Sequence, residues 1–198
     1  MATARPGEPS HPDVTLTTEG AATMSITDDA LRANATLAGD YDPAGAGPPA
    51  PKIAIVTCAD PRLSGVVRLM GLADADVDLI RNVGTVIDDD AMRSLIVSTR
   101  MLGTREILVI NHDDCGLSRF SGDELVERLR AETGSYPIAP AQFFTFTDAE
   151  RNTREQVLKV RSHPWISPDV PVRGFVFGVR TGRLTEVLVE DPVVPAAG

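Results

Sequence analysis

Residues 52–62 read KIAIVTCADPR, an apolar run that ends in a cluster of chemically reactive side chains. A second apolar run, Ile107 to Ile110, is followed in the same way by His112-Asp113-Asp114-Cys115. Continuous apolar runs of this length are typical of strands that are buried on both faces of a parallel sheet. Ligands gather at the carboxyl ends of such strands, so we expect the two clusters to lie close together.

The rest of the chain alternates between helical and extended patterns. We expect helices at 66–72, 88–102, 123–132 and 148–161, and further strands at 77–80, 174–179 and 184–189, with a Thr181-Gly182 turn between the last two. The stretch 136–146, rich in Pro and Phe, reads as a long loop. The pattern predicts an α/β fold with a mostly parallel β-sheet core that is flanked by helices.

Both ends of the chain lack the hydrophobic periodicity that the central part of the sequence shows. Residues 1–23 are rich in Pro, Thr, Gly and Ala and are expected to form a disordered tail, and residues 191–198 a flexible C-terminus. Between Met24 and the linker-like stretch 42–49, residues 30–38 predict a short helix that follows capping residues at 25–29. This helix would form an N-terminal arm of a domain that spans residues 24–190.

The composition excludes several classes of partner. The chain has 198 residues, with 19 basic and 28 acidic side chains and a formal charge of -9, so a nucleic-acid backbone would be repelled. It has neither an apolar run of about 18 residues nor a secretory signal, which predicts a soluble, cytoplasmic protein with no membrane partner. The thiols would then stay reduced, which favours metal binding over a disulfide.

The two clusters contain both cysteines of the chain and offer a zinc ligand set. Cys58, His112 and Cys115 would supply two thiolates and an imidazole, which suit Zn²⁺ and leave one tetrahedral position open for water. Asp60 is near enough to accept a hydrogen bond from that water or to replace it on the metal. Arg62 decides between the two, because pairing with Arg62 would hold Asp60 off the metal.

The two thiolates also bear on the pH dependence. They neutralise the charge of Zn²⁺, so this centre should acidify its water less than a three-histidine site does. We therefore expect activity to rise toward alkaline pH. Asp113 or Asp114 could help the product proton to leave, and the sequence selects neither of them.

Several motifs together resemble one family. They are Cys-x-Asp-x-Arg at 58–62, His-x-x-Cys-Gly at 112–116, Ile-Arg-Asn-Val-Gly at 80–84, Asp-Asp at 89–90 with Arg-Ser-Leu at 93–95, and Leu-Gly-Thr-Arg at 102–105. With these motifs the chain resembles the short bacterial branch of the β-class carbonic anhydrases from about Met24 to Val189.

The resemblance implies an activity and roles for particular residues. Cys58, His112 and Cys115 would bind zinc, Asp60 and Arg62 would form the catalytic dyad, and the reaction would be the reversible hydration of CO₂ to bicarbonate and a proton. The family is built on homodimers, which often pair into dimers of dimers, and its N-terminal helix packs on a neighbour.

The sequence also departs from the family pattern at three positions. Ala59 and Pro61 flank Asp60, and Pro61 fixes its own φ and biases Asp60 toward extended geometry. Asp113 replaces a small hydroxyl residue and adds negative charge near the metal. The resemblance therefore predicts modest activity.

Other interpretations of the same residues stay open. A related zinc hydrolase of CS₂ or COS would use the same ligands. A non-catalytic binding module would hold structural zinc, with Asp60 closing the coordination sphere. A Cys58–Cys115 dithiol would serve as a redox sensor, the cysteines could be buried structural thiols, and Asp60–Arg62 could be an ordinary surface ion pair.

Overall fold

A computed structural model describes residues 25–41, 50–140 and 142–190. The chain divides into two units, one up to Ala46 and one from Gly47 onward, and each is considered by itself. The predicted tail over 1–23, the linker over 42–49 and the flexible end over 191–198 lie outside the described residues.

The first unit contains helix α1, Ile26–Leu37, which confirms the predicted N-terminal helix. The helix begins at Ile26 rather than at Ala30, because Ser25 forms a capping box with Asp28. The Ser25 hydroxyl accepts the Asp28 N–H, and the Asp28 carboxylate accepts the Ser25 N–H at 3.0 Å. No residue of α1 is buried.

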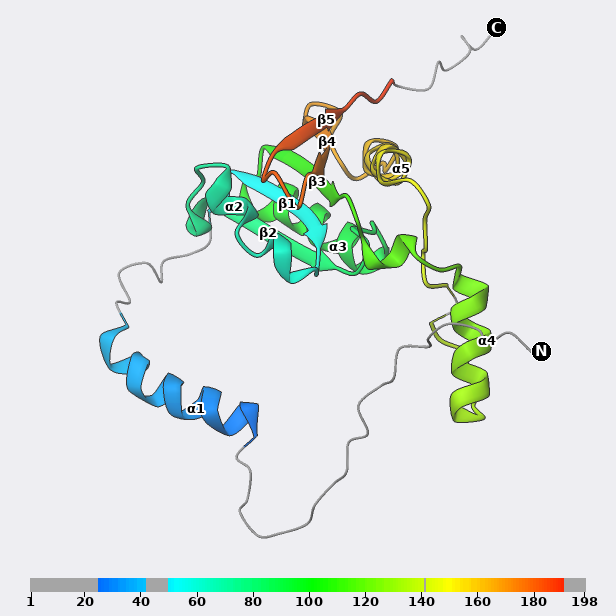
Figure 1. The fold of residues 1–198 in the computed structure, drawn as a ribbon. Coiled ribbons are helices and arrows are strands. Elements are labelled where there is room, and N and C mark those ends of the chain that lie inside the picture. Colours follow the sequence, from blue (N-terminus) through cyan, green and yellow to red (C-terminus); the bar gives the residue numbers. More distant parts are fainter. Residues whose placement is uncertain (1–24, 42–49, 141, 191–198) are drawn as a thin grey trace, which may run out of the picture. The chain divides into compact units, whose positions relative to one another are not determined.

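The second unit is built on one five-stranded sheet (Figure 1). Its strands lie in the order β2-β1-β3-β4-β5, and the first three neighbouring pairs are parallel whereas β4 and β5 are antiparallel. The strands are β1 (Ile53–Cys58), β2 (Val77–Asn82), β3 (Glu106–His112), β4 (Val172–Phe177) and β5 (Leu184–Val187). The mostly parallel sheet that the sequence predicts is confirmed.

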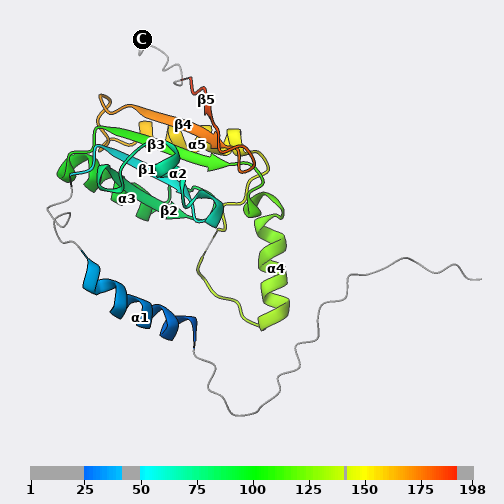
Figure 2. The ribbon, with the colours of Figure 1, turned by 60° about the vertical axis from the view of Figure 1, so that its left-hand side comes forward.

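Helices lie against the sheet (Figures 1 and 2), and apolar side chains pack on both of its faces. On one face, Ala54 and Val56 of β1 pack in a core with α3 (Asp89–Val97) and α5 (Ala149–Arg161). On the other face, Ile55 of β1 packs with α2 (Val66–Leu69) and the loops beyond β1 and β3. The alternation explains why β1 is apolar at every position except Thr57, because both of its sides are buried and the Thr57 hydroxyl donates to the Ile110 carbonyl at 2.8 Å.

Several boundaries differ from the sequence-based expectation. Among the strands, β2 continues to Asn82 rather than to residue 80, β4 spans Val172–Phe177 rather than 174–179, and β5 ends at Val187 rather than at residue 189. The helix predicted at 88–102 is α3 followed by a π-helical turn over Ser98–Leu102, which ends at Gly103 with a left-handed φ of 90°. Helix α2 ends at Leu69 rather than at residue 72. The last turn covers residues 178–183, where the Gly178 N–H bonds the Arg183 carbonyl at 2.8 Å, so it is longer than a Thr181-Gly182 turn.

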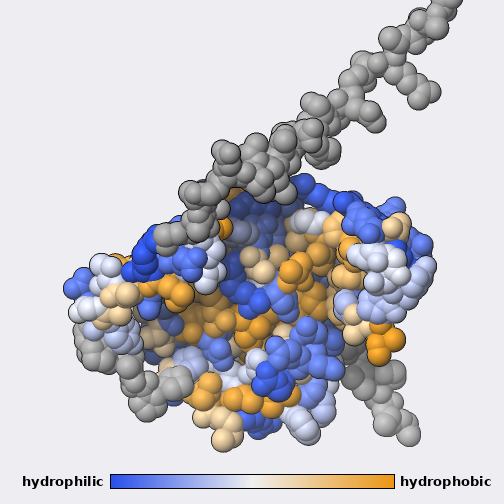
Figure 3. All heavy atoms as spheres, turned by 90° about the horizontal axis from the view of Figure 1, so that it is seen from below, coloured by the Kyte–Doolittle hydropathy of each residue, from blue (hydrophilic) through white to orange (hydrophobic). Residues whose placement is uncertain are grey.

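Helix α4 (Gly122–Thr133) has no buried residue and lies beside the sheet rather than on either face (Figure 2). It leads into the predicted long loop before α5. No helix in the described part of the chain is long and apolar enough to cross a membrane. Apolar surface is nonetheless exposed across the face drawn in Figure 3.

Candidate metal centre

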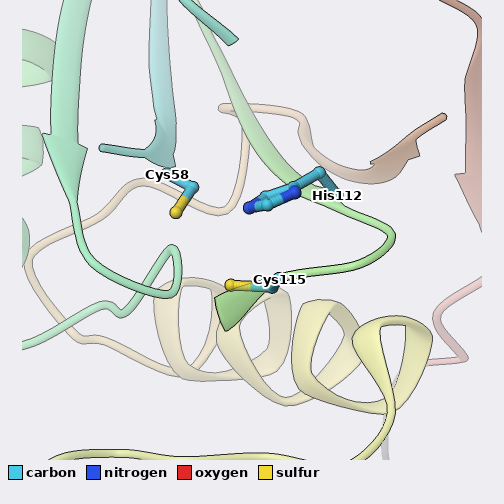
Figure 4. A group of neighbouring side chains, drawn as sticks. All are labelled: Cys58, His112 and Cys115. Carbon is cyan, nitrogen blue, oxygen red and sulfur yellow. The ribbon is translucent and has the colours of Figure 1, made fainter. Parts of the chain in front are cut away.

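Cys58, His112 and Cys115 meet at the carboxyl edge of the sheet. Cys58 ends β1, His112 ends the neighbouring strand β3, and Cys115 lies in the loop that follows β3. Their donor atoms all lie within 4.8 Å of one another, and the three side chains point toward one another (Figure 4). Among the described residues they form the one group of three His, Cys, Asp or Glu side chains arranged to hold a metal ion. The convergence of the two clusters is confirmed.

The imidazole of His112 is oriented for metal binding. Its Nδ1 lies 2.8 Å from the backbone carbonyl of Asp113 and donates to it, so in the neutral ring Nε2 is the nitrogen with a free lone pair. Nε2 is buried and is one of two buried side-chain N or O atoms in the described residues that have no hydrogen-bond partner. An unpaired buried nitrogen is costly unless a ligand satisfies it, so the site fits a metal ion.

The two sulfurs are buried and neither forms a disulfide. The Cys115 side chain hydrogen-bonds Cys58, which lowers the pKa of Cys58 and raises the pKa of Cys115, because the pair holds one proton between its sulfurs. The Gly84 N–H also donates to Cys58 Sγ at 3.4 Å and favours its thiolate. Metal binding would therefore find one thiolate formed and release the proton of the other.

Electrostatic effects on His112 oppose each other. Burial lowers the pKa of the imidazole, but the adjacent, negatively charged sulfur of Cys58 raises it, and the net shift is upward. A cation is favoured at Nε2, either as a proton or as a metal ion.

Asp60 and Arg62 form a bidentate pair next to the ligands. Arg62 Nε donates to Asp60 Oδ1 at 3.0 Å, Nη2 donates to Oδ2 at 2.7 Å, and the Arg62 N–H also donates to Oδ1 at 2.9 Å. These bonds hold the pKa of Asp60 well below its usual range, so the carboxylate stays ionised. Oδ2 lies 3.9 Å from His112 Nε2, at the edge of the ligand cluster.

Asp114 anchors the other side of Arg62. Its Oδ2 accepts from Arg62 Nη1 at 3.0 Å, its carbonyl accepts from Nη2 at 3.0 Å, and Arg119 Nη2 donates to its Oδ1 at 2.6 Å. The hydrogen bonds from Arg62 and then from Arg119 lower the pKa of Asp114, which makes it a poor proton acceptor. Asp113 turns away, and its Oδ1 accepts the Val179 N–H at 2.9 Å.

Arg81 is a further part of the site that was expected only as a residue of the family pattern. Its Nε donates to the Cys58 carbonyl at 3.1 Å and its Nη2 to the Asp60 carbonyl at 2.8 Å. One guanidinium on β2 thus holds the backbone of the whole Cys58–Asp60 turn. The sequence signal was an Arg on the strand next to β1, but the register that aims it at these carbonyls is a property of the sheet.

An open cavity of about 400 Å³ adjoins the ligands. Cys58, Asp60 and Cys115 are part of its lining. The remaining lining is mostly apolar and comprises Ala59, Val83, Gly116, Leu117 and Phe120. The site therefore joins a small apolar space to a buried set of soft donors.

The fold and the site define a class, the α/β proteins with a Cys₂His group that could hold a metal ion at the carboxyl edge of a parallel sheet. The family model described as "Carbonic anhydrase" matches residues 53–184. The chain is 38% identical over 164 residues to the β-carbonic anhydrase 1 of Mycobacterium tuberculosis, covering 83% of this chain and 99% of that protein. The chain belongs to the β-class carbonic anhydrase family.

Two further relatives extend this comparison. The crystal structure of a carbonic anhydrase from Streptococcus mutans matches with a TM-score of 0.75 and 37% identity, covering 84% of this chain and 99% of that one. A carbon disulfide hydrolase from an Acidianus strain is 32% identical over 152 residues, covering 66% of this chain and 74% of that protein. The family thus includes relatives that are named for two different substrates.

Proposed function

We propose that this protein catalyses the zinc-dependent, reversible hydration of CO₂ to bicarbonate and a proton. The observation that carries the proposal is the meeting of Cys58, His112 and Cys115 beside a carboxylate that Arg62 holds. Membership of the carbonic anhydrase family and the 38% identity to a β-carbonic anhydrase support it.

The donor set favours zinc over the other common divalent metals. Two sulfurs and one nitrogen are soft or borderline donors, whereas Mg²⁺ and Ca²⁺ prefer oxygen. When it is bound, zinc supplies Lewis acidity that makes a water molecule nucleophilic near neutral pH.

Asp60 and Arg62 would orient the nucleophile. Because the Arg62 bonds keep Asp60 ionised, the carboxylate can accept a hydrogen bond and direct a water lone pair at the substrate. The linear, apolar CO₂ molecule would occupy the cavity lined by Val83, Leu117 and Phe120. Asp114 is paired to two guanidiniums, so we assign the export of the proton to buffer or solvent.

The test is stopped-flow CO₂ hydration from about pH 6.5 to about pH 9, on protein whose zinc is quantified in the same preparation. We expect about one zinc per chain and a rate that rises with pH. Full zinc occupancy with no hydration at any pH would contradict the proposal. It would then favour a structural zinc in a non-catalytic binding module.

A second candidate function is the hydrolysis of CS₂ or COS, which have the same linear shape as CO₂. It is favoured by the 32% identity to a carbon disulfide hydrolase. Sulfide release from CS₂ and competition between CS₂ and CO₂ separate the two functions. We expect CO₂ turnover to dominate and sulfide release to stay at the level without enzyme.

The assembly proposed with this function is a homodimer or a dimer of dimers. Its support is the family membership together with the exposed apolar residues of α1, among them Ile26 and Leu37. A domain over residues 24–190 and a cytoplasmic location stay predictions from the sequence.

A further inference from the structure

The loop that follows β2, residues 83–87, is strained and is here named the Gly84 loop. Gly84 has φ 89° and Thr85 has φ 58°, although a β-branched residue rarely adopts left-handed backbone. Both residues are buried. Such backbone persists only where surrounding contacts fix it, and it concentrates at functional sites.

Three amide side chains fix the Gly84 loop. The Asn82 side chain bonds both backbone groups of Val86. It accepts the Val86 N–H at 2.8 Å and donates to the Val86 carbonyl at 2.6 Å. From α5, Gln156 accepts the Ile87 N–H at 2.8 Å and Asn152 donates to the Gly84 carbonyl at 3.1 Å. The loop is therefore clamped from its own strand and from the helix behind it.

The direction of these bonds follows from one fixed donor. The Ile87 N–H can only donate, so the Gln156 oxygen faces it and Gln156 Nε2 must face Asn152. Nε2 donates to Asn152 Oδ1 at 3.2 Å, which turns Asn152 Nδ2 toward the Gly84 carbonyl. Asn152 and Gln156 are four residues apart on α5 and so share one helix face.

The clamped loop delivers a hydrogen bond to a metal ligand. The Gly84 N–H donates to Cys58 Sγ at 3.4 Å. A side chain at position 84 would place its Cβ 2.7 Å from Leu117 Cδ2 and would be strained at a φ of 89°, so the position favours glycine. The chain of contacts runs from α5 through Gly84 to the sulfur of Cys58.

We propose that Asn152 is a positioning residue of the metal centre, which fixes Gly84 so that its N–H bonds Cys58 Sγ and limits how strongly that sulfur donates electrons to the metal. The inference rests on the proposed metal centre and goes beyond it, because Asn152 bonds the loop rather than a ligand. Hydrogen bonds to a ligating sulfur change how strongly the sulfur donates electrons to the metal. Loss of such contacts around the ligands weakens metal binding.

The experiment compares Asn152→Leu with Thr153→Val after cobalt replaces zinc. Thr153 is a matched control, because it is buried on the same helix and its hydroxyl bonds only the local Ala149 carbonyl at 2.7 Å among the contacts described. We expect Asn152→Leu to move the sulfur-to-cobalt charge-transfer bands to longer wavelength, since a thiolate without its N–H donor gives up electrons more easily. Competition with a chelator should show zinc affinity reduced about 10-fold or more.

Gln156→Leu should shift both measurements in the same direction by a smaller amount, because Asn152 would keep its bond to Gly84. Unchanged bands and affinity in Asn152→Leu would overturn the proposal, as would an equal change in Thr153→Val. If Asn152→Leu does not fold, the unmutated protein loaded with a magnetic isotope of cadmium gives a direct measurement. Scalar coupling between the Gly84 amide proton and cadmium supports the proposal, and its absence overturns it.

These measurements contain no CO₂, so they do not depend on the proposed activity. A protein that binds cobalt at the cysteines but does not hydrate CO₂ would contradict the proposed function. The cobalt spectra of Asn152→Leu would still test the role of Asn152. An unmutated protein with no sulfur-to-cobalt bands would contradict the metal centre itself, and the inference would fall with it.

Discussion

At the scale of single residues, the site depends on which partner a charged side chain has. Asp60 is 17% exposed, yet it stays ionised because Arg62 bonds both of its oxygens. The sequence spacing allowed both this pair and the alternative in which Asp60 joins the metal ligands, and the family resemblance implied the pair. The structure has the pairing with Arg62, which would keep Asp60 off a bound metal, as the proposed reaction requires.

Asp60→Asn tests the role of this carboxylate. The amide keeps the shape but presents one acceptor oxygen instead of two and carries no charge, so it orients water poorly and pairs weakly with Arg62. We expect CO₂ hydration to fall about 100-fold with zinc content unchanged, measured by stopped flow and metal analysis.

Asp148→Asn is the control for this variant, because Asn serves as well as Asp at the N-cap of α5. It should keep full activity. Loss of zinc together with activity in Asp60→Asn would instead make Asp60 a ligand.

At the scale of elements, α5 packs against β4 at a glycine. A Cβ on Gly174 would lie 2.7 Å from Thr153 Cγ2 and 2.9 Å from Val157 Cγ2. Gly174→Ala should therefore push α5 off the sheet and destabilise the fold by about 1–3 kcal/mol, measured by urea unfolding. Adding Thr153→Ser removes the nearer methyl group and should restore part of the loss. No recovery in the double variant would contradict the close packing.

The β4–β5 pair carries an ion pair whose contribution depends on pH. Arg173 donates twice to Glu186, at 2.8 Å for each bond, and this lowers the pKa of Glu186. Stability from a lowered carboxyl pKa is present above the ordinary Glu value of about 4.3 and is lost as the pH falls through the folded value. Glu186→Gln should be slightly less stable than the unmutated protein near neutral pH, and the difference should vanish in acid.

High salt should also shrink that difference at neutral pH, because both side chains are more than a third exposed. Urea unfolding at several pH values and salt concentrations measures it. If the difference in unfolding free energy between Glu186→Gln and the unmutated protein grew in acid, the Arg173–Glu186 ion pair would not be its source.

The elements also show how far the sequence could be interpreted. Apolar runs located β1 and β3 because strands buried on both faces have no polar side, and the edge where they end followed from the parallel topology. Ser25 was seen as a capping candidate, but the sequence did not reveal that its box with Asp28 starts α1 at Ile26.

Tertiary contacts set what the sequence could not indicate. Asn152 and Gln156 looked like ordinary polar residues of a helix, and only the packing of α5 behind the Gly84 loop gives them partners in the site. The same applies to the two bonds from Arg81 to the turn after β1, which depend on strand register.

At the scale of the whole molecule, the proposed metal links the strands that carry its ligands. Binding to the folded state alone stabilises a protein by about 2.7 kcal/mol when free ligand is 100 times the dissociation constant. Removing zinc with a chelator should therefore lower Tm by about 5–10 °C, measured by calorimetry, and added zinc should restore it. An unchanged Tm after verified loss of metal would contradict a site between β1 and β3.

The last prediction concerns the assembly and helix α1. An isolated helix of 12 residues is marginal in water, so α1 needs its apolar side covered. Ile26, Ala30, Ala33 and Leu37 follow the i, i+4, i+7, i+11 spacing of one helix face, and Ile26 and Leu37 are 88% and 66% exposed. The proposed dimer would supply that cover from a second copy of the chain.

Changing Ile26 and Leu37 together to Ser should then shift the protein from dimer toward monomer, measured by light scattering over a range of concentrations. The control changes Asp29 and Arg32 on the same helix to Ala and should leave the mass unchanged. Because the sheet and its metal ligands all lie in the second unit, zinc content should persist in both variants. A mass that stays that of a dimer in the Ser variant would mean that α1 does not hold the copies together.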